Sequence, residues 1–437
     1  MQRSLGIFLC GLVLGGLGGY ALHRPNGKST AESSAGIAQG DSSAGAMERT
    51  GAKRKAEDEK ILLGDIASVP FQELYEILAR QRPEDIARIA QQLDALPQGR
   101  DGYAKIKAFF AAWAHLDPNA AFAAAVSFQS KEARQSAISA TIAGADASAT
   151  GTIAMAINDM SKDVLADAVR SNLLSEAISK WSEVDPAAAA HALSSSSVAG
   201  MGFTPAVYSV GFNWGASDPA AAVAWAEQQP HGSFAINPIN GVVLGWWKKD
   251  PAAAEAYVLA KAGTPDGDQL IPTLVSEIAN EDKNKAVEFL SHLPDAKLRQ
   301  QGYGMLASQL SFTDPKAASA WALSLPADVA PNAVGSSVSV WARSDPAAAG
   351  NWIKGLSGKV RDNAISSYSY AIVETDPAGA ANWASTISDV EQRKKVLRRA
   401  TSQWLERDPA AARAWISSSS LGAEEIARLL ATPAPSP

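Results

Sequence analysis

The chain has 437 residues, of which 46% are apolar and 19% charged, a balance typical of a folded protein and not of a disordered one. Its formal net charge of −6 argues against nucleic acid as a partner. Its one cysteine, Cys10, excludes an intramolecular disulfide and a zinc site built from cysteines.

The first 23 residues form an N-terminal targeting segment. The apolar residues 5–22 are about as long as a membrane-spanning helix, which predicts a signal anchor. Small residues at Gly19 and Ala21 also fit a cleavage site, so a secretory signal peptide is the alternative. We therefore expect a single-pass inner-membrane protein with most of the chain in the periplasm, or a secreted or periplasmic protein if the segment is cleaved.

Residues 24–60 are rich in Ser, Gly, Ala and Lys and predict a flexible linker. In residues 61–116, apolar residues three and four apart predict helices that begin near Asp65, Pro83 and Asp101. The first of these is expected to bury one face, made of Phe71, Leu74, Tyr75 and Leu78. We expect this helical region to cap the N-terminal end of a repeat array, whose first unit would otherwise expose half of its core.

Residues 117–430 contain a repeated word. Asp-Pro recurs with a period near 32 residues, at Asp117, Asp185, Asp218, Asp250, Asp314, Asp345, Asp376 and Asp408. Degenerate copies near Asp146 and at Asp282 fill the two gaps of double length. A period of this size is typical of a solenoid or related array, here of about ten units.

Each unit has the pattern of a helical hairpin. Aspartate caps a helix, proline fits its first turn, and the alanines that follow propagate it. A longer helix then carries apolar residues 11, 8, 7 and 4 positions before the next aspartate, which is one helical stripe. The sequence thus predicts an all-α protein, an α/α solenoid of about ten 31–33-residue helical hairpin repeats, followed by a disordered tail at 431–437.

The segments Asp218-Pro219…Trp225 and Asp345-Pro346…Trp352 resemble the junction between tetratricopeptide repeats. The Leu-Gly-x-x-Tyr expected after the aromatic residue is missing, and the period is 32 and not 34 residues. Residues 117–430 more closely resemble bacterial membrane-anchored Asp-Pro/Trp repeat proteins, a tetratricopeptide-like or Sel1-like α-solenoid. This resemblance implies an interaction scaffold and supplies no catalytic residues.

We expect no catalytic, cofactor-binding or metal-binding residue. A helix cap accounts for each repeated aspartate better than a role as a catalytic acid. The repeated tryptophans lie on the apolar stripe, which favours core packing over a row of stacking platforms for a glycan or peptide. The five histidines, His23, His115, His191, His231 and His292, show no metal-ligand spacing, and no nucleotide-binding motif occurs.

Basic residues supply the one candidate binding feature, a weak one. Residues 390–407 carry Arg393, Lys394, Lys395, Arg398 and Arg399, which could hold an anionic partner or approach lipid headgroups. A solvated outer face is the interpretation we favour. Arginines also recur 15 positions before the aspartate, and we expect a surface or inter-repeat contact from Arg170, Arg299, Arg361 and Arg393.

The leading functional hypothesis is an exported, membrane-tethered helical-repeat scaffold that binds a protein or peptide in the cell envelope. The alternative is an envelope enzyme or enzyme subunit on an α/α array that acts on cell-wall glycan. That enzyme would need two carboxylates converging in one groove. A third possibility is a purely structural spacer.

Overall fold

Helices make up the regular structure of this protein. The computed structural model describes residues 57–64, 66–97, 99–196, 203–229 and 237–431, and these ranges are all-α, with no strand. The predicted signal anchor, most of the predicted linker and all of the predicted tail except Ala431 lie outside the described residues. Within the described ranges, no helix combines the length and apolarity that a membrane crossing requires.

The three helices expected at the N-terminal end are present as α2 (Phe71–Ala79), α3 (Pro83–Asp94) and α4 (Arg100–Leu116), after a 3₁₀ turn, η1 (Ile66–Ser68). Leu74 and Leu78 are buried as predicted, but Phe71 is 49% exposed. Phe71 is the first residue of α2, and its ring meets that of His115 edge to face, with ring centroids 5.8 Å apart. The sequence periodicity placed Phe71 correctly on the face but could not show that the core ends before it.

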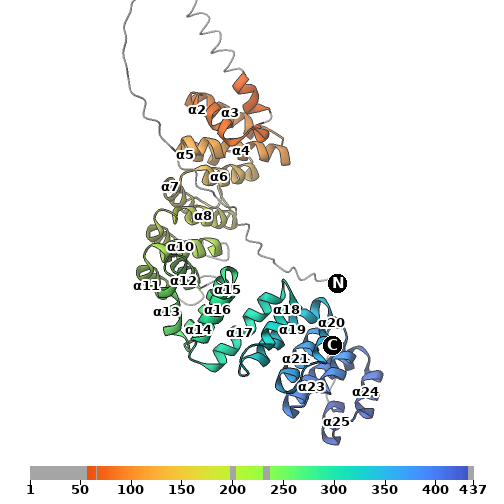
Figure 1. Ribbon diagram of the computed structural model, residues 1–437. Coiled ribbons are helices and arrows are strands. Elements are labelled where there is room, and N and C mark those ends of the chain that lie inside the picture. The colour runs from red at the N-terminus through yellow and green to blue at the C-terminus, as the bar shows by residue number, and fades with distance from the viewer. Residues whose placement is uncertain (1–56, 65, 98, 197–202, 230–236, 432–437) are drawn as a thin grey trace, which may run out of the picture. The chain divides into compact units, whose positions relative to one another are not determined.

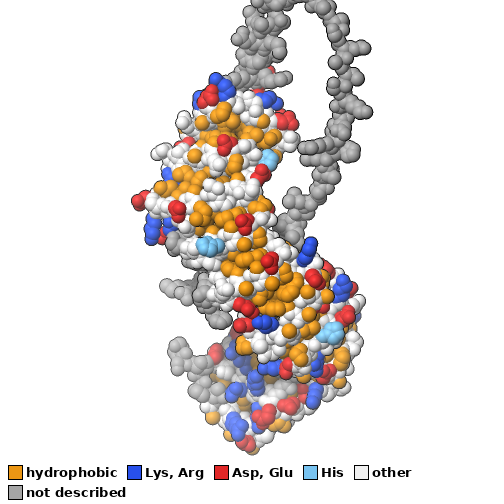
Figure 2. All heavy atoms as spheres, turned by 90° about the vertical axis from the view of Figure 1, so that its left-hand side faces the viewer, with side chains coloured by type: hydrophobic (Ala, Val, Ile, Leu, Met, Phe, Trp, Pro, Cys, Tyr) orange, Lys and Arg blue, Asp and Glu red, His pale blue; other side chains and the backbone are white. Residues whose placement is uncertain are grey.

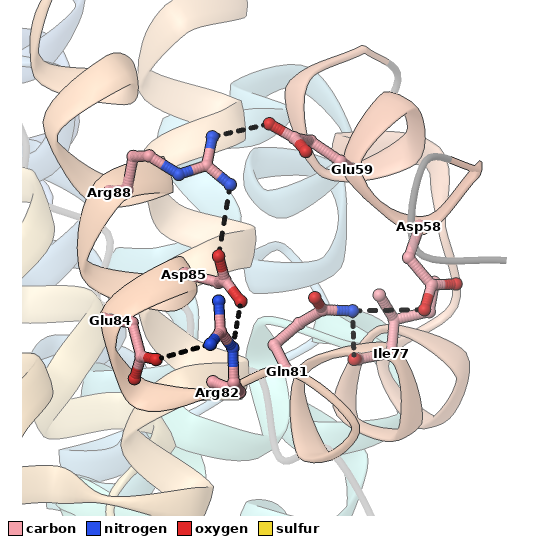
Figure 3. Close-up of polar contacts among 8 residues, drawn as sticks. All are labelled: Asp58, Glu59, Ile77, Gln81, Arg82, Glu84, Asp85 and Arg88. Atoms are coloured by element: carbon pink, nitrogen blue, oxygen red, sulfur yellow. Dashed lines mark hydrogen bonds and ion pairs between the residues drawn. The ribbon is translucent and has the colours of Figure 1, made fainter. Parts of the chain in front are cut away.

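A polar network ties the start of the described chain to α2 and α3 (Figure 3). Residues 57–63 are helical, although the sequence assigned 57–60 to the linker. Gln81 Nε2 donates to the buried Asp58 carboxylate at 3.1 Å, and Arg88 pairs with Glu59 at 2.6 Å. These contacts explain why the helical region begins before residue 61.

After α4, short helices of 8 to 12 residues alternate with longer helices of 12 to 18 residues. The short helices are α5 (Pro118–Val126), α7 (Ala147–Asn158), α9 (Pro186–Ser195), α11 (Pro219–Gln228), α13 (Pro251–Lys261), α16 (Lys283–Ser291), α18 (Pro315–Leu323), α20 (Pro346–Ile353), α22 (Pro377–Ala384) and α24 (Pro409–Ser418). The longer helices are α6 (Lys131–Gly144), α8 (Asp167–Trp181), α10 (Thr204–Ser217), α12 (Pro238–Lys249), α15 (Leu270–Glu281), α17 (Ala296–Ser311), α19 (Ala330–Ser344), α21 (Gly358–Ile372) and α23 (Val390–Arg407). A one-turn helix, α14 (Pro265–Asp268), and a last helix, α25 (Ala423–Leu430), complete the described chain.

From α4 to α23, each longer helix packs against the longer helix before it and the one after it, and the helices follow one another in chain order (Figure 1). The residues predicted to lead the apolar stripe, 11 positions before each aspartate, are all buried: Ile106, Leu174, Val207, Ile239, Tyr303, Val334, Ile365 and Leu397. One continuous core runs from Leu62 to Ala400. A second small core, of Leu405, Ala412, Ile416 and Leu429, closes the C-terminal end between α23, α24 and α25.

Glycines let α10 and α12 approach closely. A Cβ atom built on Gly245 would lie 1.8 Å from the carbonyl oxygen of Phe212, and one on Gly215 would lie 2.1 Å from that of Val242. Each helix therefore presents bare backbone where the other helix crosses it. No other residue type fits these positions unless the helices move apart.

Candidate functional site

The repeated aspartates are helix caps, as predicted. In all eight Asp-Pro words the carboxylate accepts a hydrogen bond from the backbone N–H three residues later, at 2.8–3.1 Å. Each aspartate also donates its own N–H to the carbonyl four residues earlier, at 2.7–3.2 Å. One residue thus ends the longer helix and begins the short one.

The repeated tryptophans pack against the core, which confirms the packing interpretation. The tryptophan that ends a longer helix meets the one in the next short helix, with ring centroids 5.7–6.0 Å apart, in the pairs Trp214–Trp225, Trp341–Trp352 and Trp404–Trp415. Two indole N–H groups also reach the preceding short helix. Trp225 donates to Ser194 at 3.1 Å and Trp415 to Asn382 at 2.8 Å. These bonds link adjacent units.

The recurrent arginines hold the turns between short and longer helices. Arg299 and Arg393 each donate to the carbonyl oxygen six residues earlier, at 2.9 Å. Arg361 instead donates to the carbonyl of Thr386 in the following unit, at 2.8 Å. Arg134 makes the same bond to the carbonyl six residues earlier, at 2.9 Å. Counting back from an Asp-Pro aspartate did not find it, because the next copy of the word, near Asp146, lacks the proline. The arginines are therefore structural.

A groove crosses the neighbouring helices α6, α8 and α10. Its volume is about 980 Å³. It is lined by Gln135, Ser139, Ile142, Ala143, Asn172, Ser175, Glu176, Ser179, Lys180, Glu183, Pro205, Tyr208, Ser209, Phe212 and Asn213. Most of these side chains are amides, hydroxyls or charged groups, so the groove can offer both donors and acceptors.

Polar side chains fix the walls of this groove. Ser139 donates to Glu176 at 2.8 Å, which joins α6 to α8. Lys180 donates to the carbonyls of Ile142 and Ala143 at 3.1 and 2.5 Å, and so caps the C-terminal end of α6. Burial lowers the pKa of Lys180, while Glu183 and Asp146 oppose that shift. The two walls are therefore held together before any ligand arrives.

Two serine hydroxyls in the groove have no hydrogen-bond partner within the described chain. Ser175, which is 3% exposed, and Ser179 both lie on α8. Their neighbour Ser182 donates to the carbonyl of Ser179 at 2.6 Å and accepts from Asn213 at 2.8 Å. A buried polar group without a partner is unfavourable by about 1–3 kcal/mol and is unusual away from functional sites.

Aromatic rings form one wall of the groove. Tyr208 is 39% exposed, and its ring stacks on Phe212 with centroids 6.0 Å apart and an interplanar angle of 21°. Burial raises the pKa of Tyr208, Glu277 adds to the rise, and Lys248 opposes it. The hydroxyl therefore stays protonated at neutral pH and can donate to a ligand.

This groove could not be predicted from the apolar stripe, because its lining residues on α8 and α10 occupy other positions of those helices. A signal was present. Tyr208 is the only aromatic residue found ten positions before an Asp-Pro aspartate; the equivalent positions in the neighbouring units are Ser175 and Asn240. An aromatic residue at this otherwise variable position is the one sequence feature that could have pointed to the groove.

A second, polar cleft of about 380 Å³ brings three aspartates together, Asp328, Asp362 and Asp389, beside α19, α21 and α23. Both oxygens of Asp362 accept backbone N–H groups, from Ser388 and Asp389, at 3.0 Å. Asp389 caps α23 by accepting from the N–H of Gln392 at 2.8 Å. Two of the three carboxylates thus hold the turn before α23, so the cleft is a weak match to the acid pair that the enzyme alternative requires.

The structure separates the five basic residues singled out in the sequence. Lys394, Lys395 and Arg398 line a hollow of about 390 Å³ between α23 and α25. Arg393 bonds its own turn, and Arg399 pairs with Glu374 at 3.5 Å. Figure 2 shows hydrophobic side chains over much of the face in view and charged side chains gathered at its lower end, at the height of α23 and α25 in Figure 1.

Among the residues that the structure describes, no group of three His, Cys, Asp or Glu side chains is placed to hold a metal ion. His23 and His231 lie outside these residues. No family model, curated protein or solved structure matches the chain. The arguments about function below therefore rest on the groove and the hollow themselves.

Proposed function

We propose that this protein is a non-enzymatic binding scaffold whose groove across α6, α8 and α10 holds an extended segment of another polypeptide. The observation that supports this most strongly is the meeting, in one groove, of an exposed stacked ring pair and two buried hydroxyls that have no partner in the described chain. A ligand in the groove would cover the rings, and it could pair with the serine hydroxyls only if these buried side chains rotate towards it.

An extended peptide suits the chemistry of this groove. Its backbone presents N–H and C=O groups in alternation, and amide side chains such as Gln135 and Asn172 can both donate to and accept from it. The Tyr208–Phe212 pair offers an apolar surface with a polar tip, the combination that often anchors a partner side chain. The volume of about 980 Å³ is at the upper end of small-molecule pockets, which favours a segment of several residues.

The proposal includes the architecture that presents this groove. The alternating helices are helical hairpins of 31–33 residues that stack as a tetratricopeptide-like α-solenoid, because one hairpin alone cannot bury its apolar stripe. Packing between successive longer helices and the indole bonds between successive short helices support this arrangement. The repeated residues would then build the array, and the non-repeated residues on its outward positions would determine which ligand binds.

We also propose that residues 1–23 anchor the protein in the inner membrane, with the helical region in the periplasm. If the linker behaves as its composition predicts, its roughly 30 residues would span roughly 30 Å, enough to hold the groove clear of the bilayer. Carbonate extraction of membranes, with protease added to spheroplasts, tests this: we expect the full chain to resist extraction and to be digested from outside. Release of the full chain by carbonate would contradict the proposed membrane anchor.

The binding proposal is tested by selecting peptides from a random library on the full chain. Selected peptides are then titrated against wild type and Tyr208→Ala by fluorescence anisotropy. We expect Tyr208→Ala to bind at least about tenfold more weakly, since truncating an aromatic interface anchor usually removes about 2 kcal/mol or more.

Tyr370→Ala is the matched control, because Tyr370 is 40% exposed and Tyr208 39%, but Tyr370 lies on α21 outside the groove. It should bind as wild type does. Failure to select any peptide, or equal binding by Tyr208→Ala, would overturn the proposal. Release of sugars from purified cell wall by the full chain would favour the enzyme alternative.

A further inference from the structure

The hollow between α23 and α25 is separate from the peptide groove and has its own chemistry. Its lining consists almost entirely of charged side chains, and its volume is about 390 Å³. Lys394, Lys395 and Arg398 come from α23, and Arg428 comes from α25. Two helices that are not consecutive in the chain thus bring cations to one place.

Several of the charges at this hollow are already balanced. Lys394 pairs with Glu391 at 2.9 Å, and Arg428 pairs with Glu424 at 2.5 Å. The buried carboxylate of Glu425 lies 3.7 Å from the guanidinium of Arg393, which approaches it from outside the lining. Each of these acids therefore has a nearby cation, and the second oxygen of Glu425, Oε1, is buried without a hydrogen-bond partner in the described chain.

Two cations remain. Lys395 and Arg398 make no ion pair within the described residues, and both line the hollow. They are three residues apart on one helix, so their side chains emerge from the same face. The hollow therefore carries a local excess of about two positive charges, in a space large enough for a small ligand.

We propose that this hollow binds a phosphate group, held chiefly by Lys395 and Arg398. A phosphate monoester carries about −1.5 to −2 charges at neutral pH on adjacent oxygens, which matches two neighbouring cations better than a single carboxylate does. The guanidinium of Arg398 can donate two parallel hydrogen bonds to phosphate oxygens, and the ammonium of Lys395 adds a point charge. The group could belong to a lipid headgroup or to a free phosphate compound.

Isothermal titration of the detergent-solubilised full chain tests this with two probes, inorganic phosphate and a short-chain phosphatidic acid. We expect wild type to bind, and the double variant Lys395→Gln/Arg398→Gln to bind at least about tenfold more weakly, since it loses two charge-assisted contacts. Much tighter binding of phosphatidic acid would point to a lipid source, and equal binding to a free phosphate compound. Short-chain phosphatidylcholine checks that acyl chains alone do not bind.

The control variant is Lys316→Gln/Arg413→Gln, which removes the same charge from two exposed side chains that make no ion pair within the described residues. It should bind as wild type does. The proposal is overturned if wild type binds neither probe, or if the Lys395→Gln/Arg398→Gln protein binds like the control. Because these residues lie outside the peptide groove, either result leaves the peptide proposal to its own test.

Discussion

The Asp-Pro aspartate joins two helices at a single residue. Its N–H completes the longer helix, and its carboxylate takes an N–H from the first turn of the short helix. This is why the units need no loop at this corner. The cap was predictable from the sequence, because every group involved lies within four residues along the chain.

Asp345→Ala tests the cap. We expect it to lower the free energy of unfolding by about 1 kcal/mol, because the N–H of Ala348 loses the acceptor that lies 2.9 Å away. Urea denaturation followed by circular dichroism measures the change. Asp163→Ala, at an exposed aspartate that caps no helix, should change stability by less than about 0.5 kcal/mol. Equal effects of the two variants would mean that the cap contributes nothing.

Ser175→Ala tests whether the unpaired hydroxyl at the groove lowers the stability of the protein. Its hydroxyl is buried and has no partner in the described chain, so Ser175→Ala should raise the free energy of unfolding by about 1 kcal/mol. Ser182→Ala, at the residue just after the same helix, removes a hydroxyl that makes two hydrogen bonds and should lower the free energy of unfolding by about 1 kcal/mol or more. Urea denaturation of the two variants decides this. Destabilisation by both would show that the Ser175 hydroxyl is satisfied.

A stabilising Ser175→Ala that also weakens peptide binding would indicate that the hydroxyl is kept for the ligand. The sequence could not predict this feature. A serine in the middle of a helix often bonds the carbonyl four residues earlier, and only the packing of neighbouring helices decides whether it does.

At the scale of helices, the apolar stripe was predictable and the distance between helices was not. The stripe depends on a period within one helix, so Val334 and Ile365 could be assigned to the core from spacing alone. The contact of α10 with α12 depends on where a second backbone lies. The glycines that permit it do not follow the repeat, so nothing in the periodicity marked them.

Gly245→Ala tests this contact. The added Cβ would meet the carbonyl oxygen of Phe212, so α10 and α12 must separate, and we expect a loss of about 1–3 kcal/mol of stability. Thermal denaturation provides the measurement. Gly355→Ala is the control, because a Cβ there lies 3.5 Å from its nearest neighbour, the carbonyl oxygen of Trp352, an ordinary contact distance. If the two variants melt together, the helices are not in backbone contact.

At the scale of the whole molecule, stability is expected to be local. Leu429 of α25 closes a small core with Leu405 and Ile416, separate from the long core that ends at Ala400. Deletion of residues 421–437 should speed hydrogen exchange in α24 and the end of α23 and leave α10 unchanged. Faster exchange throughout the chain would contradict a stack in which each unit depends only on its neighbours.

The groove is a feature of the whole molecule that the repeated word did not predict. The repeated word Asp-Pro predicted the helices and their order, because each unit carries its own caps and stripe. The groove arises only where three different units, those of α6, α8 and α10, place unlike residues side by side. Its members are far apart in sequence and share no motif, so only the stacked helices bring them together.

The most direct test of the binding account is hydrogen exchange on the full chain with and without a selected peptide. The account predicts slower exchange in α6, α8 and α10 on binding, and unchanged exchange in α17 to α21. Protection elsewhere, or no protection at saturating peptide, would contradict it.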